Sequence, residues 1–80
     1  MVKLILYGRR RCHLCDVAKD ALRELQRRLE FEVEERDVDD DPDWAARFGE
    51  EVPVGVIGDR KVFKYRVEPE RLERALLAVR

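Results

Sequence analysis

The stretch LILYGRRRCHLC, residues 4–15, decides how the rest of the chain is interpreted. Its first half continues an apolar, β-branched run from Val2 to Tyr7, which predicts a strand that ends at Gly8. Its second half carries the only two cysteines of the chain, Cys12 and Cys15, directly after three consecutive arginines. The fold therefore depends on the element that follows this strand and on where it places the cysteines.

A helix is predicted directly after the cysteines, because apolar residues recur there at steps of three and four over roughly 16 residues. The members of this stripe are Leu14, Val17, Ala18, Ala21, Leu22, Leu25 and Leu29. Cys12 then stands in the turn after the first strand, and Cys15 in the first turn of the helix. Residues three apart on a helix lie about 5–6 Å apart, which matches the Cα separation of a disulfide. The pair can therefore open and close a disulfide with little backbone movement.

Three more strands are predicted from alternation and turn residues. Residues 31–38 alternate between apolar and acidic side chains and predict a second strand. Residues 54–57 and 61–65 predict two further strands, which Gly58-Asp59 joins into a hairpin.

Two more helices complete the chain. The first begins with Asp41 as its cap and Pro42 in the first helical position, and it ends at Gly49. The second opens at Glu68-Pro69. The side chains expected to face the core are Trp44, Ala45 and Phe48 from the first helix and Leu72, Ala75, Leu76 and Val79 from the second. The order β-α-β-α-β-β-α predicts an α/β fold: a mixed four-stranded sheet with helices on both faces.

Composition and charge exclude several classes of function. The 80 residues suffice for one domain, and 44% of them are charged, yet the formal net charge is only −1. Such a balance does not favour nucleic acid or a membrane surface as a partner. The longest apolar run near the N-terminus, Leu4 to Tyr7, is too short for a signal peptide or a membrane helix. We therefore expect a cytoplasmic protein.

The amide and hydroxyl content is unusual. The chain has no Ser, Thr or Asn, its one Gln is Gln26, and Arg greatly outnumbers Lys. Few thermolabile amides and many charges are typical of some thermophile proteins. A GC-rich genome accounts for the same composition, so both origins stay open.

A reactive thiolate is predicted at Cys12. At the helix cap its sulfur can accept the free N–H groups of Leu14 and Cys15, and the positive end of the helix dipole points at it. Further positive charge comes from Arg9, Arg10 and Arg11. Together these features place a cysteine pKa in the range of about 3.5–7.5. We predict that at least one of these arginines holds the thiolate or attracts an anionic partner; the alternative is a solvated basic turn.

His13 lies between the cysteines. It adds positive charge when protonated, and it either tunes the redox potential or is an exposed residue at the start of the helix.

These motifs resemble those of the glutaredoxin-like members of the thioredoxin-fold superfamily, in particular small bacterial glutaredoxin-like proteins. LILYGRRRCHLC is similar to their strand, turn, C-x-x-C and helix start. EVPVGVIGDRKVF, residues 51–63, is similar to their Val-Pro followed by a β-hairpin. The resemblance covers nearly the whole chain. It implies a single glutaredoxin-like domain over residues 1–80 with a thioredoxin-like fold.

The resemblance also implies a function, thiol–disulfide oxidoreductase activity in cell redox homeostasis. Cys12 would be the attacking nucleophile and Cys15 the resolving thiol. Pro53 would be a cis-proline that faces them, and the backbone of Val52 would pair with the extended chain of the substrate. The implied substrates are protein or low-molecular-weight disulfides.

The chain departs from the family pattern where glutaredoxins bind glutathione. His13-Leu14 replaces the usual Pro-Tyr between the cysteines, and Phe63-Lys64 falls near the usual Gly-Gly. Gly-Gly permits close backbone approach because it lacks side chains. We therefore expect no bound cofactor and only weak, largely electrostatic binding of glutathione. Glutathione or a thioredoxin-type reductase is the expected reductant, and the protein is expected to be a monomer.

Two other classes of function stay open. The cysteine pair could bind a metal, as in small copper chaperones, but those end on a strand and usually carry Met where this chain has Arg10. A closed zinc site needs four ligands, and the motif offers only Cys12, Cys15 and His13, so no metal site is predicted. An iron–sulfur cluster shared across a dimer, or a non-catalytic interaction domain, remains an alternative.

Overall fold

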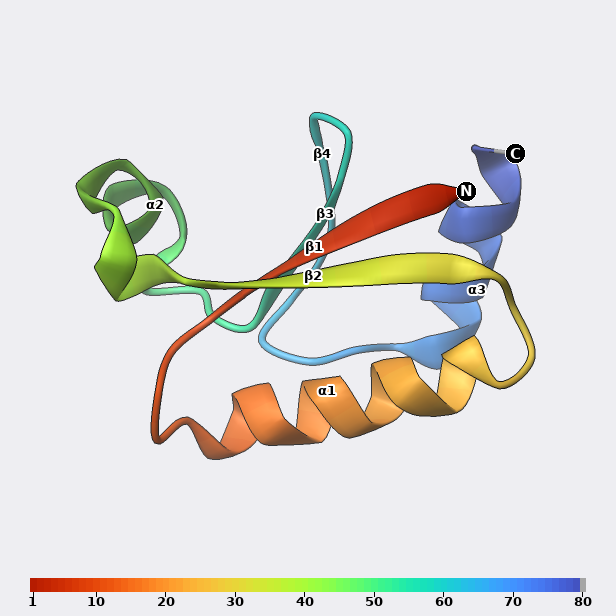
Figure 1. Ribbon diagram of the computed structural model, residues 1–80, viewed down its shortest axis with the longest axis horizontal. Helices are drawn as coiled ribbons and strands as arrows, with labels where there is room; N and C mark the ends of the chain where they lie inside the picture. Colours follow the sequence, from red (N-terminus) through yellow and green to blue (C-terminus); the bar gives the residue numbers. More distant parts are fainter. Residues whose placement is uncertain (80) are drawn as a thin grey trace.

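The computed structural model describes residues 1–79 and has the predicted order of elements, with one additional short turn (Figure 1). The strands are β1 (Val2–Gly8), β2 (Phe31–Asp37), β3 (Val54–Ile57) and β4 (Arg60–Lys64). The helices are α1 (His13–Gln26), α2 (Pro42–Phe48) and α3 (Pro69–Ala78). The additional element is the 3-10 turn η1 (Val38–Asp40), which joins β2 to α2.

The four strands form one mixed sheet in the order β2-β1-β3-β4. β1 runs parallel to β2 and antiparallel to β3, and β3 and β4 form the predicted antiparallel hairpin. β1 therefore has a neighbour on each side. The loop that carries the cysteines leaves its carboxyl end and leads into α1 (Figure 1).

The two faces of the sheet are covered by different helices, as predicted. Side chains alternate along β1, so Leu4 and Leu6 face α1 and α3, whereas Tyr7 faces α2. The buried core under α1 and α3 consists of Leu4, Leu6, Ala18, Leu22, Leu25, Phe31, Leu72 and Leu76. The smaller core under α2 consists of Tyr7, Val38, Phe48, Val54 and Val56. In Figure 1, α1 runs below the strands, α3 lies at their right-hand end near the N-terminus, and α2 lies at the left-hand end.

The predicted apolar stripe of α1 is wrong in its first turn. Leu14 and Val17 are 50% and 47% exposed, whereas Cys15 is 1% exposed. The helix is rotated so that Cys15 continues the line of Ala18, Leu22 and Leu25 toward the sheet. In α3, Val79 was likewise expected on the apolar face but is 50% exposed just beyond the last helical residue.

Three strand boundaries differ by one residue from the prediction, and the first of them is the start of β4 at Arg60 instead of residue 61. β2 stops at Asp37, because the Asp37 carboxylate accepts the N–H of Asp39 at 2.8 Å and starts η1, which buries Val38. β4 stops at Lys64, because Tyr65 adopts a φ of 69° and cannot extend the strand. The Asp41 cap is confirmed: its carboxylate accepts the N–H of Asp43 at 2.8 Å.

Gly55 in β3 leaves room for an aromatic ring on the neighbouring strand β4. The ring of Phe63 in β4 lies directly against its Cα, and any Cβ at this position would overlap the ring. A bulge between β3 and β4 falls at the same place, between Gly55 and Val56. Within residues 1–79, no helix has the length and apolar character that crossing a membrane requires.

Candidate active site

Cys12 caps α1, as the sequence predicts. Its backbone is extended, with φ −111° and ψ 108°, and its Sγ accepts the backbone N–H of Cys15 at 3.2 Å. Of the two predicted sulfur contacts, the one to Cys15 is present. Cys12 and Cys15 form a disulfide with a Cα–Cα separation of 5.2 Å. The predicted proximity is confirmed, because the first turn of α1 brings the two residues to disulfide distance.

The two cysteines differ in burial. Cys15 is 1% exposed, while Cys12 is half-buried and forms the outer end of the pair. Gly8 lies against the inner cysteine: a Cβ on Gly8 would be 3.3 Å from Sγ of Cys15. The sulfur of Cys12 is therefore the more accessible of the two from solvent, and the sulfur of Cys15 lies behind it.

The Val52–Pro53 peptide bond is cis, as the resemblance implied. Tyr7 in β1 pairs with Val54 in β3, so the next step of the same antiparallel register places Pro53 opposite Gly8. Since Gly8 covers Cys15, this register brings the proline loop to the same end of the sheet as the cysteines. The Pro53 carbonyl accepts the N–H of Tyr65 at 2.8 Å, which ties the loop to the end of β4.

The three arginines have different surroundings. Arg9 is anchored within the protein: its Nε lies 3.1 Å from Asp39, and one of its Nη atoms donates to the carbonyl of Gly49 at 3.1 Å. Arg10 is 87% exposed and pairs with Asp37 at 3.4 Å. Arg11 is exposed, has a φ of 55°, and has no ion pair within residues 1–79. Arg9 therefore joins the cysteine loop to η1 and to the end of α2, while Arg10 and Arg11 face solvent.

His13 is exposed at the first position of α1. Its ring therefore faces solvent beside the disulfide.

Arg36, which was not among the predicted site residues, supports the end of β1 from the α2 side. Its guanidinium donates to the hydroxyl of Tyr7 at 3.1 Å, lies 5.0 Å from the ring centroid of Trp44, and pairs with Glu34 at 2.5 Å. The signal was present in β2, where Glu34 and Arg36 are two residues apart and so share a face. Hydrogen bonds from Lys3 first and then Arg36 lower the pKa of Glu34, and Glu34 in turn raises the pKa of Arg36.

Glu51, just before the proline loop, is held by β4. Its carboxylate accepts hydrogen bonds from Lys61 at 2.5 Å and Lys64 at 3.3 Å. The hydrogen bond from Lys61, followed by that from Lys64, lowers the pKa of Glu51 below its ordinary value of 4.5. Lys64, expected near a glutathione site, thus already has a carboxylate partner.

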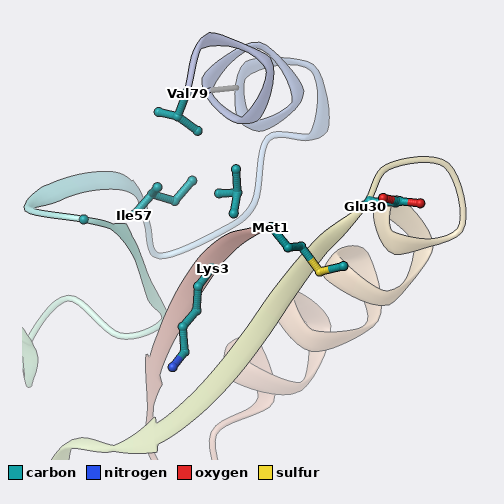
Figure 2. Close-up of a pocket in the computed structure, with 7 residues that line it drawn as sticks. Met1, Lys3, Glu30, Ile57 and Val79 are labelled. Atoms are coloured by element: carbon teal, nitrogen blue, oxygen red, sulfur yellow. The ribbon is translucent and has the colours of Figure 1, made fainter.

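Two hollows lie at opposite ends of the sheet. A polar one lies beside the inner cysteine and is lined by Cys15, Gly8, Lys19, Glu35 and Arg36, among others. A more open one lies at the amino end of β1 between Met1, Ile57, Glu30 and Val79 (Figure 2). Because β1 has seven residues, each rising about 3.3 Å, roughly 20 Å separate the two ends. The hollow in Figure 2 therefore has no part in the chemistry of the cysteines.

Residues 1–79 contain no group of three or more His, Cys, Asp or Glu side chains placed to hold a metal ion. The C-x-x-C motif of one chain supplies two thiols, those of Cys12 and Cys15, with the exposed His13 between them.

Comparison with known proteins identifies the family. The family model described as Glutaredoxin-like domain (DUF836) matches residues 3–77. The chain belongs to this family. No curated protein gives a significant match.

Solved structures similar to this glutaredoxin-like domain agree in fold. Protein Ne2328 from Nitrosomonas europaea is 29% identical with a TM-score of 0.84, over 92% of this chain and 89% of that one. Protein XcR50 from X. campestris is 34% identical with a TM-score of 0.74, over 94% and 96%. A malarial protein, 14% identical with a TM-score of 0.72 over 98% and 96%, shows the likeness in fold alone. With the sheet order above, these likenesses confirm the thioredoxin-like fold. The family and the disulfide are together consistent with a redox role.

Proposed function

We propose that this glutaredoxin-like domain is a thiol–disulfide oxidoreductase that acts on protein or low-molecular-weight disulfides. The observation that carries the proposal is the asymmetry of the pair: Cys12 is the outer, capping sulfur and Cys15 is buried behind it. The position of the proline loop supports it, because the β1–β3 register places Pro53 opposite Gly8, which lies against Cys15. An incidental pair of cysteines would need none of this arrangement.

The reaction transfers two electrons from the dithiol to the substrate. The Cys12 thiolate attacks one sulfur of the substrate disulfide, forms a mixed disulfide, and releases the other sulfur as a thiolate that takes a proton from solvent. Cys15 then loses its proton, and its thiolate attacks Sγ of Cys12. The S–S bond to the substrate breaks, the second substrate thiolate leaves, and the Cys12–Cys15 disulfide remains.

The cap position explains why Cys12 would attack first. In the reduced protein, the N–H of Cys15 and the positive end of α1 stabilise a thiolate at Cys12. Arg10, Arg11 and, when protonated, His13 add positive charge from the solvent side. The backbone of Val52 beside the cis-proline is the group proposed to pair with an extended substrate. Glutathione or a thioredoxin-type reductase would return the disulfide to the dithiol, and neither needs to stay bound.

The test combines a redox titration with two serine variants. The Cys12–Cys15 pair should titrate as a reversible two-electron couple, with a potential within the span of roughly −270 to −120 mV typical of this chemistry. Cys12→Ser should abolish disulfide reduction, whereas Cys15→Ser should accumulate mixed disulfides. Thiols that stay free at every glutathione ratio would refute the proposal. Visible absorbance of anaerobically purified protein would instead point to an iron–sulfur cluster.

A further inference from the structure

A groove along the free edge of β4 has no role in the chemistry described above. The polar and aromatic side chains that line it are Lys61, Lys64, Tyr65, Arg66, Glu68 and Arg71. It follows the last strand of the sheet and reaches the first turn of α3.

The groove is basic although the chain is not. Four cations line it, and two carboxylates neutralise part of their charge: Glu51 pairs with both lysines, and Glu68 pairs with Arg71 at 3.5 Å. Two positive charges remain in excess, in a chain whose formal net charge is −1. Arg66 has no side-chain hydrogen bond or ion pair with any other of residues 1–79. It is the cation most available to a ligand.

The edge of β4 suits an extended segment. β4 is the outermost strand on its side of the sheet, so about half of its backbone N–H and C=O groups point away from β3 and can pair with an added strand. Tyr65 is 47% exposed at the end of this edge and offers an aromatic surface beside it.

The groove is continuous with the candidate active site. The N–H of Tyr65 donates to the carbonyls of both Pro53 and Glu51, at 2.8 and 3.2 Å. Lys64 pairs with Val54, which pairs with Tyr7, so the end of β4 lies two strands from the end of β1. At about 4.8 Å between neighbouring strands, this is roughly 10 Å. Cys15 lies against Gly8 at the end of β1, and the Cα of Cys12 is 5.2 Å from that of Cys15. An extended chain whose cysteine lies at Cys12 therefore reaches the groove within about five residues.

We propose that this groove binds an extended acidic segment that flanks the reactive cysteine of a protein disulfide, so that acidic protein disulfides are the preferred substrates. The inference rests on the proposed oxidoreductase function and names its substrate class. Carboxylates of the segment pair with Arg66 and with the two lysines, which share only one carboxylate partner within residues 1–79. The backbone of the segment forms hydrogen bonds with the free edge of β4. Electrostatic attraction speeds encounter and selects partners by the sign of their charge.

The test uses three peptides of equal length whose central cysteine is capped as a disulfide with 2-mercaptoethanol. Their flanks are acidic, neutral or basic. The acidic peptide should have the highest kcat/KM, by about three- to five-fold over the neutral one, and the advantage should shrink as salt rises. Arg66→Glu should lower kcat/KM for the acidic peptide by about five- to ten-fold and raise it for the basic one. The matched control is Arg74→Glu, an equal change of charge on α3 outside the groove, which should alter either value less than two-fold.

Direct binding of the acidic peptide with serine for cysteine separates this inference from the function on which it rests. Salt-sensitive binding that Arg66→Glu abolishes, without turnover of any disulfide, would support the groove and refute the oxidoreductase. Equal turnover of all three peptides would support the oxidoreductase and refute the groove; the cations would then serve only to protect an exposed edge. An equal loss with a glutathione mixed disulfide would show that the groove takes glutathione carboxylates, and would overturn the assignment to a protein segment.

Discussion

Replacing Arg9 by Met should destabilise the domain, although Arg9 is one of the three arginines predicted to hold the thiolate or to attract an anionic partner. The change removes two interactions that join the cysteine loop to the rest of the protein. The ion pair with Asp39 is largely exposed, at 40% and 59% of the two side chains, so it contributes about 0.2–1 kcal/mol. The bond to the carbonyl of buried Gly49 is partly buried, and a hydrogen bond from a charged donor contributes about 1.5–3 kcal/mol.

Because the Arg9 side chain is 40% exposed, the lower end of each range applies, and together the two terms predict a loss of about 2 kcal/mol in the free energy of unfolding. In a domain of this size each kcal/mol corresponds to about 4–8 °C in Tm, so the transition of the oxidised protein should fall by about 8–16 °C. The assay is thermal and urea unfolding followed by circular dichroism. Arg9→Lys keeps the charge but cannot reach both partners with a rigid fork, so its loss should be intermediate.

Arg11→Met is the matched control, because it removes the same charge from the same loop. Arg11 has no ion pair within residues 1–79, so the effect on the free energy of unfolding should stay within about 0.5 kcal/mol. Equal stability of the Arg9 and Arg11 variants would refute the reasoning, since the contacts to Asp39 and Gly49 would then contribute nothing. A loss of substrate affinity in Arg9→Met at unchanged stability would restore the original interpretation.

Other perturbations test separate parts of the structure. The pKa of Glu51 is lowered in the fold, so the stability that its carboxylate contributes is complete above the unfolded pKa and is lost as pH falls below about 4.5 through the folded value. Glu51→Gln should therefore weaken the dependence of stability on pH in that window. An unchanged pH dependence of acid unfolding would show that the lysines do not stabilise the Glu51 carboxylate. Gly55→Ala should cost about 1–3 kcal/mol because the new Cβ overlaps the ring of Phe63, and adding Phe63→Leu should recover part of the urea midpoint; a double variant less stable than the sum of the two single changes would contradict the overlap. Cys12 in the reduced protein should react with iodoacetamide at pH 6 much faster than Cys15, and equal rates would argue against Cys12 as the nucleophile. Turnover of a glutathione mixed disulfide should be slow and should fall as salt rises, whereas fast, salt-insensitive turnover would show a specific γ-glutamyl site.

The sequence predicted the elements well because each has a local cause. The strand before the cysteines, the Asp41 cap and the hairpin about Gly58-Asp59 depend on residues within a few positions of one another. The cis bond before Pro53 came from family resemblance alone, since local physics favours trans.

The predictions fail where residues that are far apart in the sequence determine the local structure. Periodicity alone placed Leu14 on the buried face of α1, but counting the cysteine as apolar gives the line from Cys15 that the sheet buries. Arg9 donates a hydrogen bond to Gly49, 40 positions away, and Arg36 donates one to Tyr7, 29 positions away. Such contacts exist only once the sheet has formed, so no pattern within a short window indicates them.

The hairpin turn at Gly58-Asp59 makes the molecule suitable for building sensors. It lies beside the amino end of β1, and nothing comes within 4 Å of a Cβ at Gly58. A fluorescent protein inserted there would leave the pairing of β1 with β2 and β3 intact. It would lie at the end of the sheet opposite to the thiols. The linkers of the insertion would also avoid the far end of β4, beyond which the N–H of Tyr65 donates to the carbonyl of Pro53. An insertion at this turn could thus report the oxidation state of the Cys12–Cys15 pair without obstructing the end of the sheet at which the cysteines lie.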